Sequence, residues 1–450
     1  MNKFLPLFVL LMTSFMVSCQ RYSDGSKSKT TDSLMVVSVS GEPKQCSVVN
    51  KSHTLHLFVE NSGSMNGYIN TDSDFQMAIG RVIQLMKYKY GSANIKTYYI
   101  NTRVYQEVKP SNQDIYEFVK NMLKKDNFKK RGSTASTDLN KIVEEVLTYV
   151  DEENTAILIS DLIYSLKATS GVTTNLLYDC QNLTMSAFLE KTKEMQPGVS
   201  LATNLIQLGS AFEGHYWNWA QPTGNNYVNL KCKRPYYMCV LGTDANVKDF
   251  NKSISVESLI GYMNQFTISN KDMSNVSYTV FDTKYKKGSY KHGSEPSIKS
   301  IYSAKTNSRN EFELGIAVDL SDFTMSEQDK LDVLNYSIDQ GNYSLVRVEL
   351  IDTLQLLNPT DLRLIRENGC THALVLKSSG YPNDIKISIK RSLPEWVEAS
   401  SSLDDRRIAM DTFEQNKTFG LKYFVAGISD AYSYIAYDKE NVAVIKVNVK

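Results

Sequence analysis

Residues 53–60 read HTLHLFVE and run directly into the loop NSGSMNGY at 61–68. In an extended chain, Leu55 and Leu57 lie on one face of the first stretch, and Phe58 lies on the other. A strand that is apolar on both faces is typical of the centre of a parallel sheet that helices cover on both sides. The stretch therefore predicts a central strand that ends in a polar loop.

Apolar runs and amphipathic stretches alternate from this strand to about residue 268. Apolar residues at helical spacing predict helices at 74–86, 115–123 and 139–150, and short apolar runs predict strands at 94–100, 155–162 and 236–242. Strands that alternate with helices form doubly wound α/β sheets. We therefore expect residues 51–268 to form an α/β domain with a doubly wound, mostly parallel sheet. Ligands of such sheets bind beyond the carboxyl ends of the strands.

Beyond residue 269 the apolar pattern changes to a period of two. Runs such as FELGIAVDL at 312–320 and VAVIKVNVK at 442–450 alternate apolar and polar side chains, and this alternation predicts strands with one buried face. Apolar residues at 421–432 return to helical spacing. We expect residues 269–450 to form a second, β-rich domain that resembles a sandwich and contains one late helix.

The N-terminus has the pattern of a secretion signal. Residues 1–18 contain one early lysine and a mostly apolar stretch that is too short to cross a bilayer. Their end, MVSC at 16–19, resembles the lipobox of bacterial lipoproteins, which implies that Cys19 carries the lipid. Residues 19–50 would then hold the anchor and a flexible tether. The alternative is an ordinary signal peptide whose cleavage site contains a cysteine.

The lipobox resemblance implies a location and the composition limits the partners. A lipid on Cys19 implies a protein of the bacterial cell envelope, attached to the outer membrane and facing the periplasm or the outside. The 50 basic and 49 acidic residues give a net charge of +1, which argues against a surface for nucleic acid. Of six cysteines, five remain besides Cys19, so at least one of these stays unpaired within the chain.

Polar side chains gather where the predicted strands end. Glu60, Ser62 and Ser64 follow the first strand, Thr137 opens the helix before a later strand, and Asp161 ends that strand. Because the carboxyl ends of parallel strands meet at one edge, we expect these residues to lie close together. The alternative is that the two serines cap backbone amides in a turn and that the aspartate caps a loop.

The order of the elements and three short motifs resemble the von Willebrand factor A domain with its metal-ion-dependent adhesion site. The motifs are ENSGSM at 60–65, STDL at 136–139 and ISDL at 159–162. That family reads Asp-x-Ser-x-Ser after its first strand, a threonine near a following helix and an aspartate at the end of the fourth strand. The resemblance implies a Rossmann-like sheet for this half of the chain, and we recognise no family for the other half.

The resemblance assigns a ligand role to each matching residue. Glu60 takes the first acidic position, Ser62 and Ser64 the two serine positions, Thr137 the threonine position and Asp161 the last position. It implies that they bind Mg²⁺, which prefers oxygen ligands, with Mn²⁺ or Ca²⁺ as alternatives. In the family, the metal accepts an acidic side chain from a partner protein, so the implied function is metal-bridged protein binding.

The chain departs from the family pattern at two positions. Glu60 stands where the family has aspartate, and its carboxylate reaches about 1.5 Å further, one carbon–carbon bond. Leu162 stands where many members have glycine, which affects the turn after the strand. Thr134 is the alternative to Thr137 for the threonine position.

A second acidic pair, Asp404 and Asp405, ends a loop at 393–405. Adjacent carboxylates are candidate ligands for Ca²⁺. We expect a solvated turn instead.

The motifs of common enzymes are absent from the sequence. The stretch SGSMNG at 62–67 does not have the spacing of the Gly-x-Ser-x-Gly elbow, and the five histidines form no zinc-protease motif. We therefore expect a binding protein rather than an enzyme. The alternatives are a structural or scaffolding lipoprotein with a vestigial metal site and, less favoured, a hydrolase that uses a serine or a metal.

Overall fold

The computed structural model of the chain describes residues 53–69, 73–132, 138–165, 173–219, 227–340, 342–353, 357–378, 380–391 and 393–450. The signal peptide and tether predicted for residues 1–50, with Cys19, lie outside these ranges, as do Thr134 and Thr137. From Asn50 onward the chain forms one compact unit.

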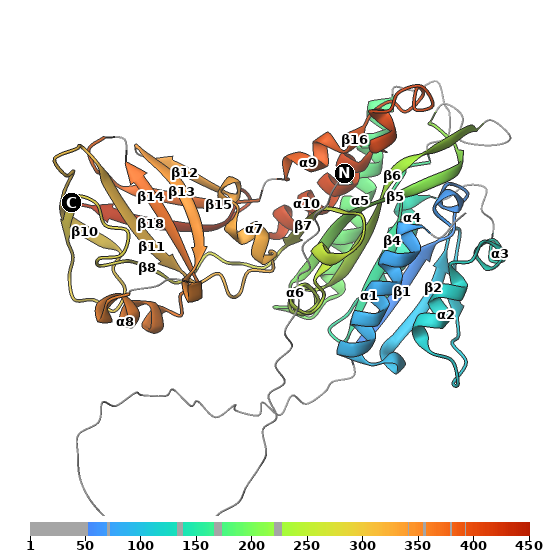
Figure 1. Cartoon of the computed structure of the whole chain (residues 1–450), viewed down its shortest axis with the longest axis horizontal. Coiled ribbons are helices and arrows are strands. Elements are labelled where there is room, and N and C mark those ends of the chain that lie inside the picture. The colour runs from blue at the N-terminus through green and yellow to red at the C-terminus, as the bar shows by residue number, and fades with distance from the viewer. Residues whose placement is uncertain are drawn as a thin grey trace, which may run out of the picture. The chain divides into compact units, whose positions relative to one another are not determined.

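A mixed seven-stranded sheet forms the centre of the first half of this unit (Figure 1). Its strand order is β3-β2-β1-β4-β6-β5-β7. The strands are β1 (Thr54–Glu60), β2 (Ile95–Ile100), β3 (Val104–Glu107), β4 (Asn154–Ser160), β5 (Leu201–Tyr216), β6 (Val228–Thr243) and β7 (Tyr262–Ser269).

Only the part of this sheet around β1 is parallel. β1 pairs in parallel with β2 and β4, whereas the β2–β3, β4–β6, β6–β5 and β5–β7 pairs are antiparallel. The α/β architecture is confirmed, but the prediction of a mostly parallel sheet is wrong. The reason is that β5 and β6 follow each other as a long hairpin, paired from Leu201–Thr243 to Tyr216–Val228. A hairpin is necessarily antiparallel, while a parallel pair needs a crossover connection.

Helices cover both faces of the sheet. Residues of α1 (Asp74–Tyr90), α2 (Ile115–Met122) and α6 (Asp244–Ser253) belong to the core on one face. Residues of α4 (Leu139–Leu147) and α10 (Leu421–Ile435) belong to the core on the other, together with buried side chains of α5 (Thr173–Glu194). A short helix, α3 (Lys125–Phe128), follows α2.

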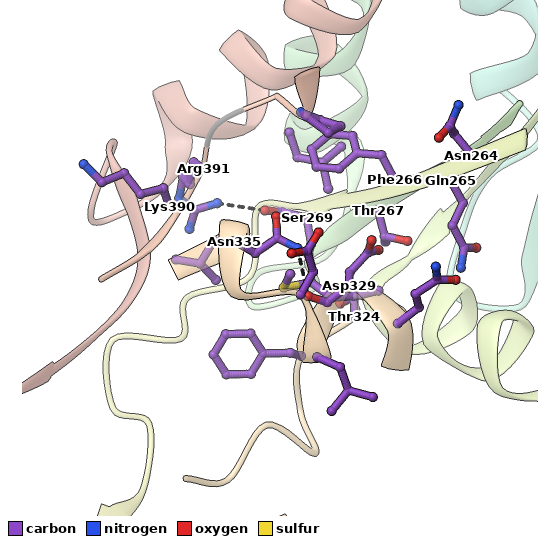
Figure 2. A pocket seen from close by; sticks show the side chains of 18 of the residues that line it. Asn264, Gln265, Phe266, Thr267, Ser269, Thr324, Asp329, Asn335, Lys390 and Arg391 are labelled. Atoms are coloured by element: carbon purple, nitrogen blue, oxygen red, sulfur yellow. Dashed lines mark hydrogen bonds between the residues drawn. The ribbon is translucent and has the colours of Figure 1, made fainter. Parts of the chain in front are cut away.

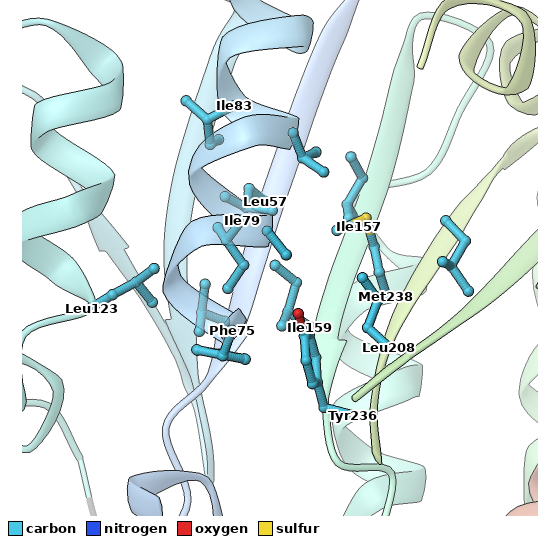
Figure 3. Close-up of a cluster of buried hydrophobic side chains, with 14 of the residues drawn as sticks. Leu57, Phe75, Ile79, Ile83, Leu123, Ile157, Ile159, Leu208, Tyr236 and Met238 are labelled. Carbon is cyan, nitrogen blue, oxygen red and sulfur yellow. The ribbon is translucent and has the colours of Figure 1, made fainter. Parts of the chain in front are cut away.

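Side chains of β1 alternate between these two cores, as period-two geometry requires. Leu57 joins the core under α1, whereas Phe58 joins the core under α4. Figure 3 shows Phe75 and Ile79 of α1 beside Leu57, with Ile157 of β4 next in the sheet. Two buried faces explain why the sequence of β1 is apolar at nearly every position.

The second half contains two sheets that share one core. The five-stranded sheet has the order β12-β15-β18-β10-β9, and the four-stranded sheet has the order β13-β14-β11-β8. Apolar side chains of both sheets meet in one cluster, as in a sandwich. The strands are β8 (Tyr278–Val280), β9 (Ser289–Lys291), β10 (Ser300–Lys305), β11 (Phe312–Val318), β12 (Tyr336–Gln340), β13 (Tyr343–Leu350), β14 (His372–Ser378), β15 (Ile385–Lys390) and β18 (Asn441–Val449), with helices α7 (Glu327–Leu331) and α8 (Pro359–Asn368).

The late helix is present, but it packs against the first sheet rather than the β-rich sheets. After β15 the chain returns through α9 (Glu395–Ala399), β16 (Ser401–Ser402) and β17 (Thr418–Phe419) to α10, which lies beside α5. Phe424 and Ile428 of α10 are buried in the core of the first half. The chain then re-enters the β-rich half as β18.

Truncation of α10 at its buried face should therefore destabilise the first half. We expect Phe424→Ala to lower the free energy of unfolding by about 3 to 5 kcal/mol, because the fully buried ring leaves a cavity. Tyr434→Ala on the exposed face of the same helix should change it by no more than about 0.5 kcal/mol. Urea unfolding of both variants checks this, and equal effects would contradict the packing of α10.

Candidate functional site

The carboxyl ends of β1 and β4 bring four polar residues together, and we call this the strand-end site. The two strands are parallel and neighbouring, with Val59 paired to Ile159. Glu60 is the last residue of β1, and Asp161 directly follows β4. Both carboxyl groups are almost fully buried, at 3% and 2% exposure. The parallel pairing therefore places the first and last predicted ligands at the same edge.

The two predicted serines lie at this edge and contact each other. Ser62 Oγ is 3.1 Å from Ser64 Oγ, and Ser64 begins a short 3₁₀ helix at 64–68. Burial raises the pKa of Asp161, and a hydrogen bond from the Ser64 side chain opposes that shift. Ser62, Ser64 and Asp161 therefore form one connected group. Thr137, the remaining predicted ligand, lies outside the described residues.

Glu60 is held by the end of β4. Ser160 Oγ donates a hydrogen bond to the Glu60 carboxylate, and Leu162 N donates to Ser160 Oγ at 2.8 Å. Leu162 has a φ of +51°, in the left-handed region that favours glycine. That conformation costs a residue with a Cβ roughly 1 to 2 kcal/mol, and strained residues of this kind gather at functional sites. Burial of the leucine side chain helps to hold the turn.

The loop after β1 is fixed on its other side by close packing. Tyr68 is buried and donates to the Pro235 carbonyl of β6 at 2.6 Å. Gly67 lies so close to β5 that an added Cβ would be 2.2 Å from the Phe212 ring. The small residue therefore lets the 3₁₀ helix approach the long hairpin, and the serines are held by packing on both sides.

Two asparagines clamp a neighbouring loop against the site. Asn61 Nδ2 donates to the carbonyls of Phe128 and Arg131 at 3.1 and 2.9 Å. Asn101 Nδ2 donates to Asn61 Oδ1 at 2.8 Å and also to the Arg131 carbonyl. This network fixes the chain up to Arg131 beside the end of β1. Sequence reasoning did not single out either asparagine.

A buried arginine supplies positive charge beside Asp161. Arg234 of β6 is 1% exposed, and its attraction for Asp161 opposes the effect of burial on the pKa of that carboxyl. Its guanidinium donates to the carbonyls of Gln415 and Lys417 at 3.2 and 3.3 Å, and it lies 4.6 Å from the Tyr216 ring centroid. Among the described residues, its Nε has no hydrogen-bond partner.

Asp405 of the acidic pair at 404–405 belongs to the same buried region, so the prediction of a solvated turn is wrong for this residue. Tyr216 Oη donates to Asp405 Oδ2 at 2.7 Å, and Trp219 N donates to Oδ1 at 3.0 Å. Burial raises the pKa of Asp405 to about 6. Asp404 is exposed and pairs with Arg406. The return of the chain after β15 brings this pair to the hairpin, which no local pattern indicated.

Arg234 had a signal in the sequence that could have identified it. In β6 it lies two residues before Tyr236 and four before Met238, and all three share one face of the strand. Tyr236 and Met238 are buried in the core of that face. A charged residue at a core-facing position needs a partner, so the spacing alone pointed to a buried charge.

Comparisons with protein families, with curated proteins and with solved structures gave no match for this chain. Within the described ranges, no helix combines the length and the apolar character that a membrane span requires. The same ranges contain no group of three or more His, Cys, Asp or Glu side chains placed to hold a metal ion. Serine hydroxyls are not part of such groups, so the strand-end site must be judged on its own geometry.

Removal of the buried charge should destabilise the protein more than removal of its exposed neighbour. We expect Arg234→Met to lower the free energy of unfolding at pH 8 by about 3 to 5 kcal/mol, because the protein would lose the hydrogen bonds to the Gln415 and Lys417 carbonyls and the attraction for the buried Asp161. Lys233→Met, at an exposed neighbouring position, should change it by no more than about 0.5 kcal/mol.

The loss in Arg234→Met should depend on pH in a defined direction. Without the guanidinium, the already raised pKa of Asp161 rises further. A carboxyl with a raised folded-state pKa destabilises the protein above its unfolded pKa, and the penalty is relieved as pH falls and the group is protonated. Unfolding at pH 5 should therefore show a smaller loss than unfolding at pH 8, and the opposite trend would contradict the attraction between Asp161 and Arg234.

Proposed function

We propose that this chain is a lipid-anchored protein of the bacterial cell envelope that binds a partner protein at the strand-end site, by way of a divalent metal. The observation that carries the proposal is the convergence of Ser62, Ser64 and Asp161, with Glu60 beside them, at one edge of the sheet. Ligands of α/β sheets bind at this edge, beyond the carboxyl ends of parallel strands.

The fold inferred here is a von Willebrand factor A-like, doubly wound core that a hairpin extends. Its support is the parallel β2-β1-β4 segment with helices on both faces and an antiparallel β3 at its edge. The long β5–β6 hairpin and β7 add an antiparallel half to that core. The strand-end site would then lie at the end of this parallel segment, where the motifs at 60–65 and 159–162 stand in the sequence.

The donor set suits a hard cation. Glu60, Ser62, Ser64 and Asp161 offer only oxygen, as Mg²⁺ prefers, and Mn²⁺ and Ca²⁺ take the same ligands. Thr137 completes the set that the resemblance implies. The bound ion would supply a coordination position for an acidic side chain of the partner. The chain itself positions the ligands, through the Ser160 hydrogen bond to Glu60 and the strained turn at Leu162.

The proposal assigns no catalytic step to the strand-end site. Ser62 Oγ and Ser64 Oγ hydrogen-bond to each other, Ser64 also hydrogen-bonds to the Asp161 carboxyl, and among the described residues no histidine bonds to either hydroxyl. The two histidines at β1 bond elsewhere, His53 to Thr155 and His56 to Tyr98 and Asn154. A nucleophilic serine needs a base within hydrogen-bond reach, so these contacts favour binding over hydrolysis.

A second candidate, a scaffolding lipoprotein with a vestigial metal site, is favoured by Arg234. Its guanidinium places a positive charge beside Asp161, where a metal would place its own. Like charges repel strongly in a buried site, so the arginine opposes metal binding. In this case the acidic edge is neutralised within the chain, and the partner surface does not require a cation.

Metal titration separates the two candidates. We expect Mg²⁺ and Mn²⁺ to bind the wild-type protein in calorimetry, and Asp161→Ala to weaken binding at least about tenfold, since even residues that only support metal ligands change affinity about 10- to 100-fold. Asp352→Ala, which removes an exposed carboxylate elsewhere, should bind as wild type does.

Two other results would change the assignment. Binding that appears only in Glu60→Asp would mean that the longer glutamate has closed the site, as the scaffolding candidate requires. Absence of binding in both, with unchanged stability, would reject the metal. Pull-down from envelope extracts with and without chelator then shows whether a partner depends on the cation.

The lipid anchor has its own test. Expression in a bacterial host with a labelled fatty acid should give a labelled, membrane-associated protein, because the motif at 16–19 places Cys19 at the cleavage site. Cys19→Ser should remove the label and release the protein from the membrane fraction. Label retained in Cys19→Ser would contradict the anchor, and Cys46→Ser serves as the matched control.

A further inference from the structure

A cavity of about 460 Å³ lies away from the strand-end site, where the two halves of the compact unit meet (Figure 2). Residues 262–269 of β7 form one wall, residues between 322 and 335 around α7 form the second, and Lys390, Arg391, Pro394 and Trp396 form the third. This volume lies within the range of small-molecule sites, about 300 to 1,000 Å³. None of the predicted metal ligands lines it.

The walls are tied to each other by hydrogen bonds, so the cavity is preformed. Asn251 Nδ2 donates to Thr267 Oγ1 at 3.2 Å and to the Thr324 carbonyl at 3.1 Å. Thr324 Oγ1 also donates to the Asp244 carboxylate. Arg391 Nη1 donates to the Ser269 carbonyl at 2.9 Å, which joins the third wall to β7. A ligand would not have to pay for ordering these walls.

The cations that line the cavity are engaged by the protein. Arg391 directs its guanidinium at four backbone carbonyls, those of Ser269, Lys271, Asp438 and Asn441. The side chain of Lys271 pairs with Asp244 at 3.5 Å. Lys390 lies 4.0 Å from Asp339. Each of these cations therefore already contacts oxygen atoms of the protein before any ligand arrives.

Of the three carboxylates that line the cavity, only one has a cationic side chain at ion-pair distance among the described residues. Asp322 pairs with Lys248 at 3.0 Å, but within the described part of the chain Asp329 and Asp332 have no lysine, arginine or histidine at ion-pair distance. Asp329 Oδ2 is buried without a hydrogen-bond partner. The carboxylate also interacts with Ser326, and Asp329 is one of the residues that line the cavity, so a donor of a ligand there would meet an acceptor that lacks one.

Two amide side chains of the walls have a fixed orientation. Gln265 Nε2 donates to Glu257 Oε1 at 2.7 Å, and Asn335 Nδ2 donates to the Asp329 carbonyl at 2.8 Å. Both partners can only accept hydrogen bonds, so each nitrogen uses one of its two N–H donors in this contact and each amide oxygen is left as an acceptor. Figure 2 shows Asn335 beside Asp329. The cavity therefore has amide and carboxylate acceptors with a fixed orientation on two of its walls.

The rest of the lining is apolar and partly aromatic. Phe266 and Trp396 are half-buried at the cavity, and Tyr262 lies on the same wall as Phe266. Met325 and Leu331 come from the opposite wall. Flexible methionines adapt to varied apolar shapes, and aromatic faces attract cations. This surface suits an aliphatic or aromatic body next to a positively charged end.

We propose that this cavity binds a small amphipathic amine, whose ammonium group donates to Asp329 and Asn335 and whose apolar body packs against Phe266, Trp396 and Met325. The site is independent of the metal, because it shares no residue with the strand-end site. It would make the protein a receptor for a small cationic ligand as well as for a protein partner.

Calorimetry with three probes of the same body tests the proposal on the full chain. The probes are 2-phenylethylamine, 2-phenylethanol and phenylacetate, which share a phenyl ring on a two-carbon chain and carry a cationic, a neutral and an anionic end group. We expect the amine to bind and the alcohol and carboxylate to bind at least about tenfold more weakly, the loss expected for one charge-assisted hydrogen bond. Equal binding of amine and alcohol, tighter binding of phenylacetate, or no binding of the amine would overturn the proposal.

Matched variants locate the contact. Asp329→Asn should weaken binding of the amine at least about tenfold, whereas Asp322→Asn, on a lining carboxylate that already has its lysine, should change it less than about twofold. Unchanged affinity in Asp329→Asn would overturn the assignment of the ammonium. Thermal unfolding should show that Asp329→Asn is as stable as wild type or more so, because the buried carboxylate has a raised pKa of about 6.

The binding of the amine does not depend on whether the strand-end site binds a metal. Asp161→Ala should bind 2-phenylethylamine as wild type does, even if metal binding fails in every variant. A preference for a neutral sugar such as N-acetylglucosamine over the amine would also overturn the proposal, since it would show that the acceptors recognise hydroxyl groups rather than a charge.

Discussion

The burial of two opposite charges, Asp161 and Arg234, is the constraint on which the edge of the first sheet depends. Removing each charge from water costs of the order of several kcal/mol, and the attraction between the two groups opposes the effect of burial on Asp161. The aspartate follows a parallel strand, and the arginine comes from the hairpin. The attraction therefore acts between the two halves of the sheet, and Tyr216, which contacts Arg234 and donates to Asp405, extends the network to the returning chain. A ligand that binds at this edge would therefore change the electrostatic energy of these two buried charges.

The sequence was a good guide wherever the pattern is local. The apolar pattern of β1 predicted a central strand, the helical spacing predicted α1 and α4, and the period-two runs predicted the β-rich half. The positions of Ser62, Ser64 and Asp161 follow from the same local argument, because parallel neighbours end at one edge. Even the turn at Leu162 was indicated, since its left-handed φ occurs where a glycine was expected.

The features that sequence reasoning missed all depend on distant pairing. β5 and β6 are antiparallel because they form a hairpin with each other. An apolar run has the same pattern in a parallel and in an antiparallel strand, so the sequence did not indicate this direction. The packing of α10 against α5 completes the core of the first half with a helix that follows most of the second half in the sequence. Asp405 looked like a surface residue because its partner, Tyr216, is 189 residues away along the chain. Local polarity cannot predict such a contact.

The return of the chain also explains why a cavity forms where the two halves meet. Lys390 ends β15, and Arg391 must cross from the β-rich sheets to the first sheet before α9 begins. Where a chain leaves a sheet, backbone carbonyls lose their partners on the neighbouring strand and need other donors. Arg391 donates hydrogen bonds to the carbonyls of Ser269, Lys271, Asp438 and Asn441. Arg391 already donates to these four carbonyls, and it does not form an ion pair with Asp329. The same topology that joins the two halves leaves a cavity between them in which Asp329, among the described residues, has no cationic side chain at ion-pair distance, and a cationic ligand would supply one.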